Sequence, residues 1–182
     1  MRYRCRYQSG LTLLELMITL AVIAVLLGVV APSFNDFFDK NRLKQAAEEV
    51  YGILARAKAE AVTRDMDLFV NIDSGAWCAG YATAAGCTCS PLPDPDDAGA
   101  CAVPVGNPAV NVLQVVDGAN FTDVNLTSGD MGFTFDRVRG TTGGNTISFT
   151  AGAWSLDIVV SSAGRIRLCA PDAARTMGYP QC

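Results

Sequence analysis

Histidine is absent from this 182-residue chain, and no lysine follows Lys58. Histidine is the side chain that most often acts as a general base near neutral pH, and it is a common zinc ligand. No glycine-rich phosphate loop follows an expected strand, and the acidic residues gather in turns rather than as a catalytic pair. The sequence therefore argues against an enzyme, and we expect neither a cofactor nor a bound metal.

A long apolar run extends from Leu11 to Ala31, and its only polar side chains are Thr12, Glu15 and Thr19. About 20 apolar residues are enough to cross the hydrocarbon core of a bilayer as a helix. The run therefore predicts a membrane-spanning segment over residues 11–31. A carboxylate inside such a segment is costly, so Glu15 is predicted to have a positively charged partner.

Residues 1–10 form a basic leader with Arg2, Arg4 and Arg6 and no acidic residue. Positive charge next to an apolar segment favours the cytoplasmic side, so residues after the run are expected to be exported. A secretory signal places its small cleavage-site residue after the apolar region, whereas Gly10 precedes it here. The leader is therefore not an ordinary signal peptide; a plain signal anchor is the alternative.

The segment Gly10-Leu11-Thr12-Leu13-Leu14-Glu15 resembles the class III signal of type IV pilins and type II secretion pseudopilins. The resemblance implies that a prepilin peptidase cuts after Gly10 and that the new amino group of Leu11 is methylated, although most members begin with Phe. It also implies that Glu15 pairs with the terminal amine of a neighbouring pilin subunit. The implied location is the inner membrane, single-pass, with the C-terminal domain in the periplasm, and then a pilus or pseudopilus.

Residues 32–64 are predicted to continue the helix as an amphipathic segment, because Pro32 can kink a helix without ending it. Apolar residues recur there at three- and four-residue spacing, which predicts a face buried against a domain. This stripe consists of Leu43, Ala47, Val50, Leu54, Ala57 and Ala61. Two separate helices broken near Pro32 are the alternative.

Residues 65–182 alternate short β-type runs with Gly, Asp, Asn and Pro, which is typical of an antiparallel domain. The predicted strands are Asp67–Ile72, Trp77–Ala82, Val110–Val116, Met131–Asp136, Thr146–Thr150, Leu156–Ser161 and Arg165–Ala170. A loop rich in Pro, Asp and Cys is predicted from Thr83 to Asn107. The fold class is therefore α+β and pilin-like. The Trp77-Cys78-Ala79-Gly80-Tyr81 segment resembles a strand of the GspH/FimT group, or is an ordinary strand with packed aromatics.

Six of the seven cysteines follow the apolar run, and Cys5 lies in the leader. An even number of cysteines in an oxidising compartment predicts up to three disulfides. The candidates are Cys78, Cys87, Cys89, Cys101, Cys169 and Cys182. As a hypothesis, Cys169 pairs with Cys182, and the other four close the region of residues 78–101.

Two metals are the alternatives for these polar segments. Zinc would use cysteines, but Cys87-Thr88-Cys89 does not have the usual ligand spacing. Calcium would use Asp94, Asp96 and Asp97, but their irregular spacing around Pro95 does not match an EF-hand. A solvated loop is the simpler interpretation.

Positive charge is scarce from Asp65 onward, where the chain has five arginines and no lysine. The formal net charge is −4, and loss of the three leader arginines makes it −7. Arg137 and Arg139, like Arg165 and Arg167, are two residues apart, which on a strand places each pair on one face. A hairpin turn at Gly164 is predicted to present the second pair near its tip, with Ile166 and Leu168 facing the core.

The Gly164-Arg165-Ile166-Arg167 segment resembles the G-R-x-R motif of FimT-type minor pilins, which implies binding of double-stranded DNA during natural transformation. Forked guanidinium groups suit phosphate oxygens, although paired arginines also occur without any nucleic-acid role. The sequence therefore indicates a subunit that assembles into, primes or caps a type IV pilus or type II secretion pseudopilus. A DNA-binding minor pilin is the alternative.

Overall fold

The computed structural model describes residues 12–182, apart from the side chains of residues 29–33. The chain divides into two compact units, Met1–Phe37 and Phe38–Cys182. One helix, α1, begins at Leu13 in the first unit and ends at Thr63 in the second. The helix includes Pro32, so the predicted continuation beyond this proline is confirmed.

In the first unit, α1 exposes a series of large apolar side chains. They include Leu13, Leu14, Leu16, Met17, Ile18, Leu20, Val22, Ile23, Val25, Leu26 and Leu27. Thr12 precedes the helix, and its hydroxyl accepts a hydrogen bond from the backbone N–H of Glu15 at 3.2 Å, as an N-cap does. Within the part of the chain that the structure describes, no helix is both long and apolar enough to cross a membrane.

In the second unit, the helix buries one face. All six residues of the predicted stripe are buried, and Ala46 and Ile53 join them. Four residues of this face are alanines, so the helix backbone comes close to the strands beneath it. Full burial of each larger side chain contributes about 1.5–3 kcal/mol.

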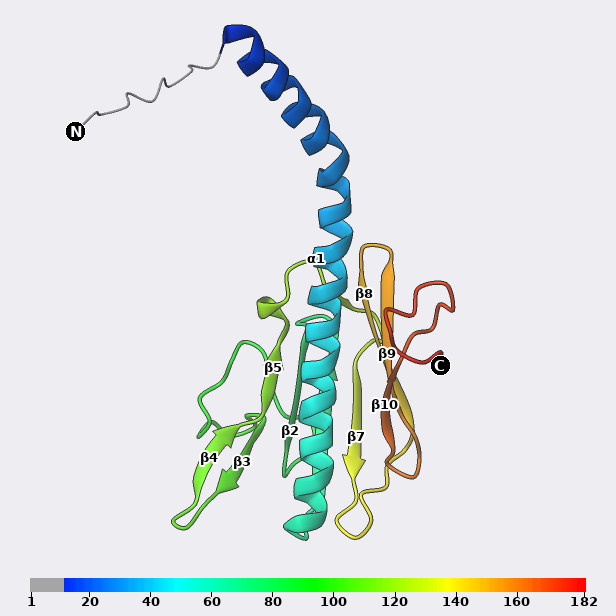
Figure 1. The fold of residues 1–182 in the computed structure, drawn as a ribbon. Coiled ribbons are helices and arrows are strands. Elements are labelled where there is room, and N and C mark those ends of the chain that lie inside the picture. Colours follow the sequence, from blue (N-terminus) through cyan, green and yellow to red (C-terminus); the bar gives the residue numbers. More distant parts are fainter. Residues whose placement is uncertain (1–11) are drawn as a thin grey trace, which may run out of the picture. The chain divides into compact units, whose positions relative to one another are not determined.

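Two antiparallel four-stranded sheets and one hairpin pack in this unit, and Figure 1 shows this unit's part of α1 running alongside their strands. The first sheet has the order β5-β2-β1-β7, with β1 at Leu68–Asp73, β2 at Cys78–Ala82, β5 at Val115–Asp117 and β7 at Met131–Phe135. The second has the order β10-β9-β8-β6, with β6 at Asn125–Leu126, β8 at Asn145–Ala151, β9 at Trp154–Val160 and β10 at Ile166–Cys169. The hairpin consists of β3 at Ala102–Val105 and β4 at Val110–Leu113, and a short 3-10 helix, η1, covers Gly118–Asn120. The predicted α+β, pilin-like fold is confirmed.

The predicted strand Val110–Val116 divides at Gln114, where its pairing changes from one neighbour to another. The N–H of Gln114 donates to the carbonyl of Cys101 beside β3, and its carbonyl accepts from the N–H of Tyr81 in β2. β3 lies inside the segment predicted as a loop, and the two-residue β6 was not predicted. β3 contains Pro104 and lies among turn-forming residues, and β6 has only two residues, so neither shows a strand pattern in the sequence.

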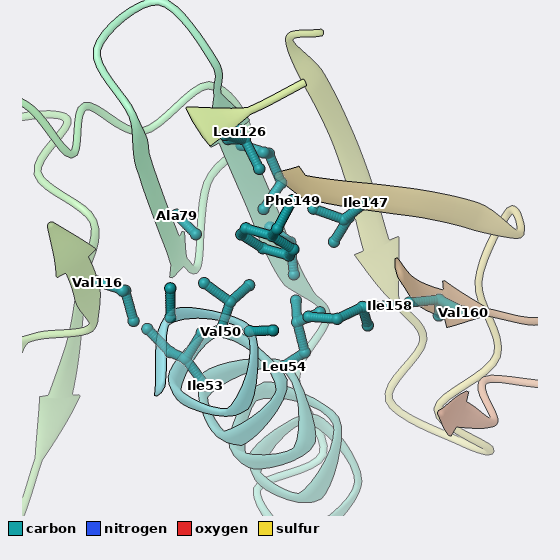
Figure 2. Close-up of a cluster of buried hydrophobic side chains, with 14 of the residues drawn as sticks. Val50, Ile53, Leu54, Ala79, Val116, Leu126, Ile147, Phe149, Ile158 and Val160 are labelled. Carbon is teal, nitrogen blue, oxygen red and sulfur yellow. The ribbon is translucent and has the colours of Figure 1, made fainter. Parts of the chain in front are cut away.

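The core lies between α1 and the two sheets. Figure 2 shows Val50, Ile53 and Leu54 of the helix directed toward side chains from both sheets, among them Phe149 and Val116. Leu54 and Phe149 are almost completely buried, at 1% and 0% exposed. The helix stripe is therefore the shared surface on which both sheets pack.

Trp77 lies immediately before β2 and fills one end of this core. Its ring stacks on Phe121 with centroids 5.6 Å apart, and its Nε1–H donates to the carbonyl of Val124 at 2.7 Å. Gly118 has no side chain to obstruct the ring, since a Cβ there would lie 2.1 Å from Trp77. The predicted pair of packed aromatics therefore includes one residue, Trp77, that lies outside the strand proper.

The six cysteines form three disulfides: Cys78–Cys89, Cys87–Cys101 and Cys169–Cys182. The first two overlap in sequence and, with Ala82, form a small buried cluster of their own. The third closes the C-terminal tail, where Ala170 also donates to Pro180 and accepts from Cys182.

Phe149→Ala is expected to lower the free energy of unfolding by about 3–5 kcal/mol, because it removes a fully buried ring from the contact with α1. Urea unfolding of the full chain, followed by tryptophan fluorescence, measures this loss. Val138→Ala is the matched control: Val138 is 70% exposed, so the change should stay within about 0.5 kcal/mol. Similar losses for both variants would contradict the described core.

Candidate functional site

Glu15 lies in the first turn of α1, where the positive end of the helix dipole favours a carboxylate. The side chain is exposed, and within residues 12–182 its carboxylate has no hydrogen bond or ion pair. Thr12 and Glu15 have the T-x-x-E spacing of a capping box, which the sequence interpretation missed. Only the hydroxyl half of that box is formed, so the carboxylate stays available to another molecule.

The predicted processing residues Gly10 and Leu11 lie outside the described residues. Their proposed cleavage and methylation stay predictions. What the structure adds is the position of the next residues, since Thr12 caps a helix that begins at Leu13.

The sequence predicted a shared strand face for Arg137 and Arg139. Neither residue lies on a strand, because β7 ends at Phe135. Asp136 ends it: its Oδ1 accepts hydrogen bonds from the N–H groups of Val138 and Arg139 at 2.6 and 2.9 Å. Gly140, with φ +63°, closes this first arginine turn, which we define as residues 136–140. The predicted shared strand face for this pair is therefore wrong, although both arginines are exposed.

Arg165 and Arg167 follow the prediction more closely. β9 and β10 form an antiparallel hairpin, and Gly164 lies in its turn with φ +73°. Both arginines are exposed, whereas Ile166 and Leu168 pack against the core. The turn itself, residues 161–165, is the second arginine turn, and Ser161 Oγ accepts the N–H of Arg165 at 3.0 Å.

The fold brings the two arginine turns into contact. A Cβ on Gly164 would lie 1.8 Å from the carbonyl oxygen of Gly140, so the backbones touch here. The N–H of Thr142 also donates to the carbonyl of Ser162 at 3.1 Å. Lys58 of α1 donates to the Gly164 carbonyl at 2.8 Å, which adds a further cation to the same surface.

The charges of this surface are only partly neutralised. Arg137 lies 3.8 Å from Asp67, whose Oδ1 also accepts the N–H of Arg137. The side chains of Arg139, Arg165 and Arg167 have no hydrogen bond or ion pair among the described residues. The arrangement therefore offers guanidinium groups to an anionic partner, although acidic side chains lie beside them.

The acidic loop of Asp94, Asp96 and Asp97 hydrogen-bonds to its own backbone. Asp94 accepts the N–H of Asp96 at 3.0 Å, and Asp97 accepts the N–H of Asp94 at 3.1 Å. Among the described residues, no group of three or more Cys, Asp or Glu side chains is arranged to hold a metal ion. The carboxylates of Asp94 and Asp97 therefore stabilise the turn, and that of Asp96 accepts a hydrogen bond from the Asn111 side chain.

The C-terminal disulfide loop holds the second unit's part of α1. The hydroxyl of Tyr179 donates to Glu48, and Lys44 lies over the Tyr179 ring. Burial, and then the Glu48 carboxylate, raises the pKa of Tyr179 to about 12. Near the start of the second unit's part of α1, the Lys40 ammonium lies 3.9 Å from the ring centre of Trp154 in β9, which adds a further contact to the helix.

A helix whose later part packs on antiparallel sheets, and whose apolar beginning carries one carboxylate with no partner among residues 12–182, is typical of a pilin-like protein. The family model for Type II transport protein GspH matches residues 46–176, and the model for the prokaryotic N-terminal methylation motif matches residues 5–31. The chain therefore belongs to the GspH family, whose members are minor pilins and pseudopilins of type IV pili or type II secretion systems.

Two crystal structures of the type IV minor pilin FimU from Pseudomonas aeruginosa are similar to the chain. One is 19% identical, with a TM-score of 0.51 over 77% of this chain and 96% of FimU. The other, in a different crystal form, is 18% identical, with a TM-score of 0.48 over 74% and 96%. At these identities the likeness concerns the fold. No curated protein sequence matches the chain significantly.

Gly164→Ala is expected to destabilise the fold, because the added methyl group would separate the two arginine turns. Gly86→Ala is the matched control: Gly86 has the same φ of +73°, but nothing lies within 4 Å of its Cβ position. The free energy of unfolding of Gly86→Ala should fall by about 1 kcal/mol, because alanine is strained in the left-handed backbone conformation. Gly164→Ala should lose about 1–3 kcal/mol more in urea unfolding. Equal losses would show that the turns do not touch.

Proposed function

We propose that this chain is a structural subunit, not an enzyme, that assembles into, primes or caps a type IV pilus or type II secretion pseudopilus. The unpaired Glu15 carboxylate in the first turn of α1 carries the proposal. A charge at the head of an apolar helix has a cost that only a positive partner offsets. Among residues 12–182 no cation pairs with Glu15, which supports a partner supplied by another molecule.

The proposed partner is the amino group of Leu11 in a neighbouring pilin subunit, freed when prepilin peptidase cuts after Gly10. Assembly then buries the exposed leucines and valines of the first unit against those of other subunits. Burying two opposite charges together is tolerated where neither could be buried alone. Methylation of the Leu11 amine keeps its positive charge.

The proposed location before assembly is the inner membrane, with a single pass over residues 11–31 and the second unit in the periplasm. The basic leader and the apolar run support this orientation. Three disulfides in the second unit support an oxidising compartment. Genes beside this one would distinguish the machines: other minor pilins favour a pilus, and a secretin with a secretion ATPase favours type II secretion.

Glu15→Val is expected to leave the amount of subunit in the membrane unchanged and to lower its recovery in sheared filaments at least about tenfold, because the neighbour's amine loses its buried partner. Immunoblots of both fractions measure the ratio. Thr19→Val removes a polar group from the same helix without removing a charge, and should assemble normally. Normal incorporation of Glu15→Val, or a native product that still begins at Met1, would contradict the mechanism.

DNA binding is the second candidate function, and the contact between the two arginine turns favours it. Arg139 and Arg165 lie on the joined turns and Arg167 lies at the start of β10. All three are exposed and have no ion pair among residues 12–182, which suits a run of phosphates. The formal charge of the chain is −4, so such binding would be local and sensitive to salt.

A mobility-shift experiment with the detergent-solubilised full chain tests this candidate. Wild type should retard duplex DNA at low salt, and Arg165→Gln with Arg167→Gln should abolish retardation because two phosphate contacts are lost. Arg42→Gln removes one exposed positive charge elsewhere on α1, where Arg42 pairs with Asp123, and should retain binding. Failure of the wild type to retard DNA at low salt would rule out this function.

A further inference from the structure

Strands β4 and β5 follow each other on either side of Gln114 and together form one edge from Val110 to Asp117, which we name the β4–β5 edge. Gln114 directs both its N–H and its carbonyl inward, to Cys101 and Tyr81, and Gly118 donates inward to Trp77. Backbone groups alternate sides along a strand, so the even-numbered residues bond to β3 and β2. The N–H and carbonyl groups of Asn111, Leu113, Val115 and Asp117 therefore point away from the sheet. Within the described chain no strand pairs with them.

This edge lacks the devices that usually prevent pairing with another chain. Its sequence, VNVLQVVD, contains no lysine, no proline and no charge before Asp117. Val110 and Val112 are 63% and 42% exposed, although both are β-branched and apolar. An unprotected apolar edge of this length is a template for an added strand.

A groove of about 280 Å³ lies between the edge and α1. Its walls are Leu113–Val116 on one side and Glu49, Gly52, Ile53 and Arg56 on the other. Glycine inside a helix costs about 1 kcal/mol relative to alanine, so a close contact usually explains it. Nothing lies within 4 Å of a Cβ placed on Gly52, so the packing of this chain does not require glycine there.

The base of the groove is rigid. Gln114 is only 6% exposed, and its Oε1 accepts from the Tyr81 hydroxyl at 3.0 Å and from Arg56 at 3.4 Å. Burial, and then the nearby Glu60 charge, raises the pKa of Tyr81, so its hydroxyl stays protonated as the donor. The groove is therefore formed before any partner arrives.

The two faces of the β4–β5 edge differ in chemistry, so a strand added there would need different side chains on each face. Val116 packs in the core with α1. Side chains alternate along a strand, so Val110 and Val112 share the face of Val116, and an added strand would place apolar groups beside these valines and over Gly52. The other face carries Asp117, and Asn111 there hydrogen-bonds Asp96 at 3.0 Å. Complementary side chains on that face are basic.

A second copy of this chain does not fit this pattern. Two edges related by a two-fold axis would pair antiparallel about Gln114 and place Asn111 of one copy opposite Asp117 of the other. Asp96, bonded to Asn111, would then face Asp117, and like charges would meet at both ends.

We propose that the β4–β5 edge binds an extended strand of a partner protein in which apolar and basic residues alternate. The partner's backbone pairs with the outward groups, its apolar side chains fill the groove over Gly52, and its basic side chains face Asp96 and Asp117. This contact does not involve Glu15 or the arginine turns, so it stands or fails independently of the proposed function.

The probe is the peptide acetyl-Lys-Val-Lys-Val-Thr-Val-Lys-amide, added at millimolar concentration to the detergent-solubilised full chain. Amide hydrogen exchange at Leu113 and Val115 should slow at least about tenfold, because their free N–H groups gain acceptors. The same peptide with Glu in place of Lys, or with N-methyl groups on alternate residues, should give no protection. Lack of protection by the Lys peptide overturns the proposal, as does equal protection by the Glu peptide.

Gly52→Leu should fill the groove and weaken peptide binding at least about tenfold without lowering the melting temperature, because leucine is the better helix former. Ala59→Leu places the same side chain on an exposed α1 position outside the groove and should bind the peptide like the wild type. Unchanged binding by Gly52→Leu overturns the proposal. Concentration-dependent dimers that Gly52→Leu abolishes would identify a second copy as the occupant and overturn it as well.

Discussion

The second unit depends on one contact, the burial of the α1 stripe between Leu43 and Ala61 against both sheets. The sheets share no strand with each other, and the buried helix face packs against side chains from both of them. Alanines on the buried face bring the helix backbone close enough for side chains from both sheets to reach it. Two features with a proposed role in the second unit lie on elements that this contact positions: the arginine turns beside Lys58, and the β4–β5 edge beside Gly52.

Elements with a strong local pattern could be predicted from the sequence. The three- and four-residue spacing of Leu43, Val50 and Leu54 predicted the buried helix face. Short β-type runs bounded by turn residues predicted β1, β2 and β7–β10 to within a few residues. β3 was missed because its four residues include Pro104 and lie among turn formers. The division of Val110–Val116 could not be predicted, because it results from a change of neighbours and not from the strand's own residues.

The candidate sites show the same limit. Alternation correctly placed Arg165 and Arg167 on an exposed face, since Ile166 and Leu168 had to face the core. The same spacing was misleading for Arg137 and Arg139, because the carboxylate of Asp136 turns the chain between them and β7. The contact between Gly140 and Gly164 joins segments distant in sequence, and no local pattern encodes it. Gly52 is unusual in the sequence because it lies within a predicted helix. Its proposed role depends on the groove beside the β4–β5 edge, which only the structure shows.

All three disulfides are local, with partners 11, 14 and 13 residues apart, and none ties α1 to a sheet. A reducing agent would therefore loosen the Pro- and Asp-rich loop and the C-terminal tail, while the helix stays attached through its buried apolar face and through polar contacts such as Lys58 with Gly164. Because Cys89 and Cys87 lie within overlapping loops, a mispaired bridge between near neighbours would trap only that corner of the molecule. The disulfides therefore stabilise the loop and the tail, and α1 is held by noncovalent contacts.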